Sequence, residues 1–326
     1  HIGAVSTSTT GYKHANTAIK HFLSARLPDF SSIRSAIAKG VRHNVPPSSV
    51  RSTIPNIHEL LDKIVPLYNS TSQKDLRALL AILLLLGSSR RLNDLVSIHR
   101  HQDSLRFNIT TLDVPSWASS CSTLRQSYIA WLQDMHLLEN RDIKNTEFIT
   151  LSFRGFSTKT NQGSYSPWVT LTECLFFPAL CPIRSAIAYL RATEDVFESL
   201  PGDSRAPCSK APTLFVSING TPRKPLQSNT LTGVVRRTLD LENSPHTPHS
   251  LRGCAASYKI AYGVSKATVL QFGNWQSEIT FNQCYFRLNS VPINVRRLSD
   301  ISVHDWRVIR AHALLHLFHV VLHSFH

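Results

Sequence analysis

The hydrophobic residues of the chain become regularly spaced from Ile57 onward and predict a mainly helical domain. The longest apolar run is Ala78–Leu86, which follows a capping-box pattern at Ser72–Asp75 and precedes Gly87. We therefore expect a helix over residues 76–86 that ends at Gly87. Because this helix is apolar nearly all round, it should lie at the centre of the domain. The run reaches only about half the length of a membrane span, so no transmembrane helix is expected.

Strands are predicted in the middle of the chain. Residues Glu147–Phe153 alternate between polar and apolar side chains, as a half-buried strand does. Trp168–Leu171 can form the partner strand. Turn-forming residues 159–163 lie between the two and place Lys159 near the tip of a hairpin. A shorter strand is expected at Leu214–Ser217, directly before a turn.

Two more helices are predicted in the first two thirds of the chain. Ser88 and Ser89 can cap one of them, with Arg90 and Arg91 in its first turn. The other covers Pro182–Arg191. A mainly helical chain with a few short strands belongs to the α+β class.

The last third of the chain is predicted to hold three short helices. The first should have Thr247 as its cap and end before Gly263. The second is expected over residues 265–272, with Gly273 as its stop. Ser277 can cap the third. Short helices separated by glycine stops favour a compact helical subdomain.

The composition adds a partner to this picture. The 326 residues include 35 Lys and Arg against 21 Asp and Glu, which gives a formal net charge of +14. With 42% hydrophobic and 17% charged residues the chain can bury a core, which excludes a disordered acidic protein. The positive excess indicates a polyanionic binding partner, with nucleic acid as the first candidate and an anionic membrane as the second. The alternative is a basic protein that is merely soluble. Six cysteines without a Cys-x-x-Cys pair argue against a zinc ribbon and favour a reducing intracellular compartment.

His249 and Arg252 are the strongest local signal for chemistry. Three residues apart in the first turn of a helix, they share one face beside the unpaired N–H groups and the positive end of the helix dipole. A guanidinium there can hold two phosphate oxygens, and an imidazole can donate or shuttle a proton. The pair therefore indicates a phosphate site, although the same spacing also occurs on solvated helix faces.

The residues around this pair occur in a familiar order. Arg91 lies upstream, three residues before Asp94, and a Gly-Asn-Trp segment and a tyrosine lie downstream. This order resembles the tyrosine recombinase (phage integrase) family, whose six catalytic positions match Arg91, Lys159, His249, Arg252, Trp275 and Tyr285. Within that family the chain resembles the eukaryotic retroelement branch (DIRS- and Ngaro-like elements), with crypton recombinases as a close second choice. The segments that carry this likeness are Leu180–Arg184, Gly263–Ser265, Gly273–Trp275 and Thr280–Phe281.

The resemblance implies an architecture and a partner. Residues 1–50 would be the remnant of a helical DNA-clamping domain, part of which precedes the chain, and residues 51–300 the catalytic domain. Its fold would be α+β, mainly helical, with a small antiparallel sheet and a C-terminal helical subdomain. The partner would be double-stranded DNA, bound by a homo-oligomer of two to four protomers without a metal, a nucleotide, a small-molecule substrate or a membrane. A mobile element of a eukaryote would place the protein in the nucleus, and otherwise it would be cytoplasmic.

The resemblance also implies a role for each site residue. Tyr285 would be the nucleophile that forms a 3′-phosphotyrosine, and His249 would accept its proton. Arg91 and Arg252 would hold the non-bridging phosphate oxygens, where charge grows in the transition state. Trp275 would donate its indole N–H and exclude water, and Lys159 would be the general acid for the leaving 5′-oxygen.

Other interpretations of these residues remain open. Arg91 could be a surface residue paired with Asp94, and Arg90 competes for its role. Lys159 could be a solvated turn lysine, and Trp275 could be only a core aromatic residue. The whole chain could be an inactive DNA-binding protein of the same fold, or an enzyme that nicks and closes DNA in the manner of a type IB topoisomerase.

The C-terminal segment, residues 301–326, is predicted to form an amphipathic helix that is rich in histidine. Its apolar side chains face away from the imidazoles, and we expect this apolar face to dock on a neighbouring protomer. Imidazoles one turn apart can also bind Zn²⁺ or Cu²⁺, but no carboxylate or thiolate accompanies them. The histidines share one helix face through spacings of four and three: His312, His316, His319, His323 and His326.

Overall fold

The computed structural model describes residues 54–111, 147–174, 178–195, 212–220, 223–242 and 244–287. The chain divides into two compact units, residues 1–52 and 53–326, and all described residues belong to the second. This unit is a mixed α and β fold, mainly helical, with a small antiparallel sheet of three strands, as the sequence predicts. The proposed clamp remnant and the histidine-rich segment lie outside the described residues.

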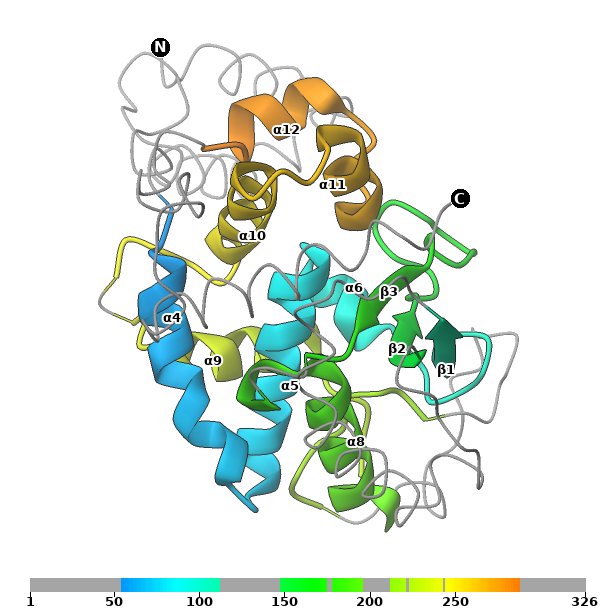
Figure 1. Cartoon of the computed structure of the whole chain (residues 1–326). Coiled ribbons are helices and arrows are strands. Elements are labelled where there is room, and N and C mark those ends of the chain that lie inside the picture. Colours follow the sequence, from blue (N-terminus) through cyan, green and yellow to red (C-terminus); the bar gives the residue numbers. More distant parts are fainter. Residues whose placement is uncertain are drawn as a thin grey trace, which may run out of the picture. The chain divides into compact units, whose positions relative to one another are not determined.

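Helix α5 (Gln73–Ser88) forms the centre of this unit, as its apolar sequence predicts. Its side chains are buried from Leu76 to Ser88. The sheet and helices α6 (Leu92–Val96), α8 (Pro182–Ala192) and α9 (Ser228–Thr238) pack around it, as Figure 1 shows. Two further helices complete this half of the unit, α4 (Ile57–Ile64) and the 3₁₀ helix η2 (Val65–Asn69). The helix at Pro182 was predicted and α9 was not.

The end of α5 differs from the prediction, which placed it at Gly87. The helix continues to Ser88, and Ser89 follows it in the left-handed region with a φ of 56°. A β-carbon on Gly87 would lie 2.9 Å from a methyl carbon of Leu171, so the glycine is needed for the close approach of the sheet. Ser88 and Ser89 therefore do not cap α6. The N-cap of α6 is Arg91. Arg90 and Arg91 therefore lie before the first turn of α6, whereas the prediction from the sequence placed them within it.

The sheet has the order β1 (Leu105–Thr111), β2 (Glu147–Phe153) and β3 (Val169–Thr172), with both pairs antiparallel. Strand β2 has the predicted bounds, and β3 begins one residue later than predicted. Strand β1 was not predicted, although its apolar residues alternate. The expected strand at Leu214–Ser217 is absent from the described residues, where Thr213 and Val216 make only isolated bridges.

The inner face of the sheet is apolar and rests on the helices. The register pairs Leu105 with Phe153 and Leu151 with Leu171, and these side chains are at most 9% exposed. Helix α8 contacts β2 and β3 on this side. The loop of residues 154–168, between β2 and β3, extends beyond this packed layer and carries Lys159.

Three helices follow as predicted, with shifted ends: α10 (Ser250–Ala261), α11 (Lys266–Gly273) and α12 (Glu278–Cys284). Helix α10 begins after a separate turn in which Thr247 and Ser250 bond to each other, so its N-cap is His249 and not Thr247. Helix α12 is capped by Ser277, as expected, because its hydroxyl accepts the N–H of Thr280.

Gly273 is the last residue of α11 and not the stop beyond it. The left-handed residue is Asn274, with a φ of 55°. A β-carbon on Gly273 would lie only 1.8 Å from the Trp275 ring, so glycine is required for packing and not for its backbone freedom. Among the described residues no helix is long and apolar enough to cross a membrane.

Candidate active site

Arg252 lies on the first turn of α10, and its guanidinium is buried with 1% of the residue exposed. Nε donates to the carbonyl oxygen of Ser89 at 2.9 Å, and Nη2 donates to that of Gly273. The third nitrogen, Nη1, is buried without a hydrogen-bond partner among the described residues. A buried donor without a partner is costly, so this corner of the guanidinium is a place for an acceptor from beyond the described residues.

Tyr285 and His249 meet beside this guanidinium. His249 Nε2 and Tyr285 Oη are 2.8 Å apart, a hydrogen-bond distance that allows a proton to pass between them. The guanidinium carbon of Arg252 lies 5.0 Å from the centroid of the Tyr285 ring and 3.9 Å from that of Trp275. The phenol is thus held between an imidazole and a buried cation.

Trp275 forms one wall of the site. Its ring centroid lies 5.3 Å from that of Tyr285 and 4.8 Å from that of Phe281, both in edge contacts. Its Nε1 is buried and has no hydrogen-bond partner among the described residues. Trp275 therefore packs as an aromatic residue of the core, and its indole N–H is also available to donate a hydrogen bond. The two interpretations of this residue, as a core aromatic and as a donor in the site, are compatible.

The backbone of Tyr285 is set against α10 by two small residues. A β-carbon on Gly253 would lie 2.8 Å from the carbonyl oxygen of Tyr285. Four residues further along α10, the Ser257 hydroxyl lies 3.4 Å from the same oxygen and accepts the N–H of Arg287 at 2.8 Å. The sequence analysis did not predict a role for Gly253. A glycine in the interior of a helix nevertheless indicates that another segment of backbone approaches the helix closely at that position.

Replacing Gly253 with Ala is expected to slow any reaction of Tyr285 by about tenfold or more, because the new methyl group displaces its backbone. Gly233→Ala is the matched control, since the nearest atom to its β-carbon is Arg237 Nη1 at an ordinary 3.5 Å. Both substitutions favour the helix by about 1 kcal/mol. Rates of covalent-adduct formation on DNA, with melting temperatures, separate the two, and equal rates would exclude the close approach as a positioning device.

Arg91 stands next to this group, at the N-terminus of α6. Its Nη1 donates to Thr160 Oγ1 at 2.8 Å and lies 4.0 Å from Asp94 Oδ2, and a quarter of its side chain is exposed. Arg90 instead is buried, and its Nη2 donates to the carbonyl oxygen of Pro167. The charge of Arg91 lowers the pKa of Arg252 more than that of Arg90 does, which favours Arg91 as its neighbour in the site.

The site carries an excess of positive charge. Burial first, and the like charge of Arg91 second, lower the pKa of Arg252 to about 9. Burial lowers the pKa of Arg90 to about 10. Both guanidinium groups stay charged at neutral pH, and Asp94 is the acid that raises both pKa values. Such a group of cations favours a bound anion.

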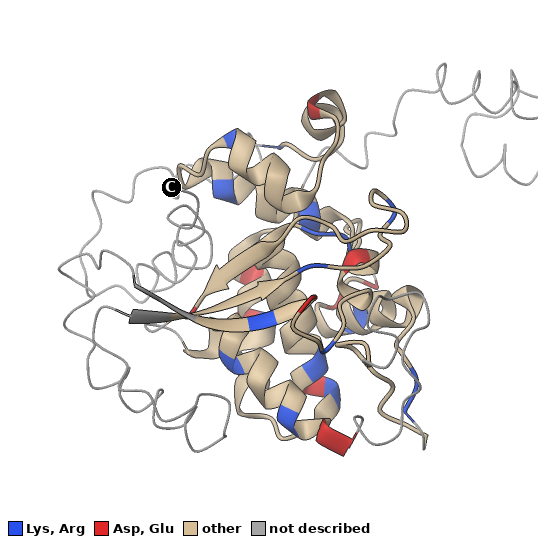
Figure 2. Ribbon diagram, turned by 90° about the vertical axis from the view of Figure 1, so that its right-hand side faces the viewer, with Lys and Arg blue, Asp and Glu red and all other residues tan. Residues whose placement is uncertain are grey.

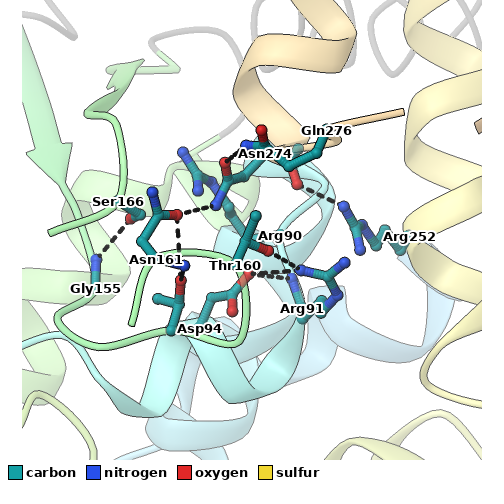
Figure 3. Close-up of polar contacts among 12 residues, drawn as sticks. Arg90, Arg91, Asp94, Gly155, Thr160, Asn161, Ser166, Arg252, Asn274 and Gln276 are labelled. Carbon is teal, nitrogen blue, oxygen red and sulfur yellow. Dashed lines mark hydrogen bonds and ion pairs between the residues drawn. The ribbon is translucent and has the colours of Figure 1, made fainter. Parts of the chain in front are cut away.

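Lys159 is exposed on the loop of residues 154–168 and does not join this group directly. The next residue, Thr160, makes the contact with Arg91. The structure thus brings His249, Arg252, Trp275 and Tyr285 together and puts Arg91 beside them. The loop that carries Lys159 is joined to Arg91 through the hydrogen bond of Thr160, which Figure 3 draws.

Lys259 is a buried cation that the sequence reasoning missed. It lies two turns beyond Arg252 on the same face of α10, and its Nζ donates to the Gly87 carbonyl and lies 3.2 Å from Ser89 Oγ. Arg252 and Lys259 thereby hold the turn between α5 and α6, which directly precedes Arg91. Burial, with a smaller effect of Arg90, lowers the pKa of Lys259 to about 7.

Lys259→Met is expected to flatten the rise of stability with pH. Above pH 7 the folded chain loses the Lys259 proton while the unfolded chain keeps it up to about 10.4, so the unfolding free energy of the wild type increases with pH. Between pH 7 and 9 this one residue contributes about 2 kcal/mol of that increase. Urea unfolding at both pH values measures it, with the exposed Lys224→Met as control. Equal slopes in all three proteins would contradict the prediction.

The described residues contain no group of three His, Cys, Asp or Glu that could hold a metal ion. Comparison of the chain with protein-family models, with curated proteins and with solved structures finds no match in any of the three. The function therefore has to be argued from the geometry of this site.

Proposed function

We propose that the protein is a DNA strand-breaking and rejoining enzyme of the tyrosine recombinase class. The observation that carries the proposal is the 2.8 Å contact of His249 Nε2 with Tyr285 Oη beside the buried Arg252, whose Nη1 has no partner in the described part of the chain. A phenol needs a base to accept its proton and a cation to favour its anion before it attacks a phosphate at neutral pH. The site places an imidazole at the phenol oxygen and a guanidinium over the ring.

The reaction exchanges one phosphodiester for another. Tyr285 Oη attacks the phosphorus of a DNA phosphodiester while its proton passes to His249, and the bond from phosphorus to the 5′-oxygen breaks. The leaving oxygen takes a proton, which Lys159 would supply, and becomes a 5′-hydroxyl. The DNA end stays attached as a 3′-phosphotyrosine. A 5′-hydroxyl of the same or another strand reverses the steps, so the bond energy is conserved and no nucleotide is consumed.

Arg91, Arg252 and Trp275 would stabilise the transition state. Negative charge grows on the two non-bridging oxygens of the pentacovalent phosphorus, and preorganised donors in a buried site act there most strongly. Arg252 Nη1 and Trp275 Nε1 are two of the buried donors without partners among the described residues, and Arg90 Nη1 is another. A phosphate oxygen at this point would satisfy the first two.

Two arginines that pack on Trp168 beside the sheet support DNA as the substrate. The guanidinium carbons of Arg106 and Arg154 lie 4.6 and 4.4 Å from the centroid of the same Trp168 ring. The Nε of each donates to a backbone carbonyl, of Gln102 and Asp103 respectively, which fixes both side chains. Figure 2 shows Lys and Arg on helices, strands and loops of the unit and not in one block. Such a surface would bind a duplex mainly through its phosphates.

Trapping of a covalent complex tests the proposal. The probe is a pool of end-labelled DNA duplexes with a randomised central segment and a nick beside it, so that the released strand diffuses away and rejoining is prevented. A labelled protein band that survives boiling in detergent is expected. Tight binding without such a band would instead indicate an inactive DNA-binding protein. Relaxation of supercoiled plasmid without any exchange between two duplexes would indicate a topoisomerase.

A further inference from the structure

The tip of the Lys159 loop has little apolar support. Lys159 and residues 162–164 are exposed, and Gly163 has no heavy atom within 4 Å of its β-carbon position. A segment of this kind is held by its polar contacts, because no buried apolar side chain anchors it. Within the loop, the Ser157 N–H donates to the Ser164 carbonyl oxygen and the Gly163 N–H to Ser157 Oγ, and these bonds close the hairpin. The side chains of the two residues after Lys159 join this hairpin tip to the site.

Both of these residues bond to the candidate active site. Thr160 Oγ1 accepts a hydrogen bond from Arg91 Nη1 at 2.8 Å. Asn161 Oδ1 accepts one from Asn274 Nδ2 at 2.7 Å, and its backbone N–H donates to Thr158 Oγ1. Figure 3 shows the two contacts on successive residues of the loop.

The two partners are themselves fixed in the site. Asn274 is 3% exposed and stands between Gly273, whose carbonyl accepts from Arg252, and Trp275. Arg91 is the N-cap of α6, and its backbone N–H donates to Asp94 Oδ2 at 3.3 Å. The guanidinium of Arg91 has five N–H donors, so its bond to Thr160 leaves others for a phosphate. The loop is thus tied to the groups that would hold the phosphate.

We propose that Thr160 and Asn161 form a two-point clamp that positions Lys159 as the proton donor to the leaving 5′-oxygen. The clamp rests on the proposed function. Its role is distinct from binding DNA, since Thr160 and Asn161 act through Lys159 and do not touch the phosphate. Loss of either contact loosens the tip of the loop relative to Arg91 and Asn274, and the ammonium group then spends only part of its time at the 5′-oxygen.

A substrate that needs no proton donor tests the clamp. A duplex from the pool is prepared with sulfur in place of the bridging 5′-oxygen at the cleaved phosphodiester. A thiol has a pKa of about 8.5, so the sulfur leaves as a thiolate and needs no proton. The 5′-oxygen would have to leave as a much more basic alkoxide and therefore needs a proton donor. Lys159→Met is expected to slow adduct formation on the oxygen duplex by about 100-fold and to have little effect on the sulfur duplex.

Thr160→Val and Asn161→Ala are expected to follow the same pattern, with losses of about tenfold on the oxygen duplex and near-normal rates on the sulfur duplex. Thr160→Ser keeps the accepting hydroxyl and should restore the rate. Gln162→Ala, an exposed neighbour in the same loop, is the control that should match the wild type. Rates under single-turnover conditions, at saturating protein, separate these steps from DNA binding.

Two results would overturn the clamp. If Thr160→Val and Asn161→Ala are slow on both duplexes, the residues act through Arg91 or Asn274 and not through Lys159. If both react normally on the oxygen duplex, the contacts position nothing. The proposed function fails differently, because the wild type would then form no adduct with either duplex.

Discussion

Replacing Tyr285 with Phe is expected to abolish the covalent protein–DNA complex completely. The substitution removes only the oxygen that would attack the phosphorus and leaves no other nucleophile in its place. The ring remains, and with it the edge contacts to His249 and Trp275 at 5.3 Å between centroids, so the fold and DNA binding should be kept. Gel electrophoresis in detergent measures the complex, and gel shift measures binding.

Tyr258→Phe is the matched control. This tyrosine lies on α10, is fully buried, and burial raises the pKa of its phenol, which disfavours the anion that attacks. Its removal should leave the complex unchanged. A complex that persists in Tyr285→Phe would mean that another side chain is the nucleophile and that the site has been misassigned.

Replacing Arg252 with Gln is expected to slow adduct formation by about 10²- to 10³-fold, which corresponds to roughly 3–4 kcal/mol of transition-state stabilisation. The guanidinium lies over the Tyr285 ring and has one nitrogen without a partner among the described residues. Arg252→Lys should recover only part of the rate, because an ammonium group cannot hold two oxygens with a planar fork.

The control for Arg252 is another buried arginine with a purely structural set of contacts. Arg100 donates to Thr193 and to the carbonyl oxygen of Leu214, and it is 7% exposed. Arg100→Gln should lower the melting temperature, since buried carbonyls lose their donors, but should not slow the reaction of the folded protein. If both variants lose stability and rate in proportion, Arg252 has only a structural role.

Those elements that depend on local sequence were predictable. The apolar run of α5 indicated a central helix, and the alternation of β2 gave a strand with the observed bounds. Strand β1 alternates too, but it pairs with a strand that follows only after residue 146, so nothing local indicates its partner. The glycine stops at Gly87 and Gly273 were wrong, because each helix includes its glycine for packing: Gly87 against the distant Leu171, and Gly273 against the ring of Trp275, two residues further on.

The site was predictable in its residues more than in its construction. The order of the six residues follows from the sequence, but their contacts depend on helices that meet only in the fold. Gly253 matters because Tyr285 returns to α10, and Asn161 matters because it meets Asn274, more than a hundred residues away. Lys259 was missed because the pattern of α10 does not distinguish a buried lysine from an exposed one.

The most direct test of the central claim is to identify the residue that carries the DNA. The wild-type protein is trapped on the nicked duplex pool, digested with protease and nuclease, and analysed by tandem mass spectrometry. We predict that the nucleotide is linked through a 3′-phosphate to Oη of Tyr285. A nucleotide on any other residue, or the absence of every nucleotide-bearing peptide, would contradict the account.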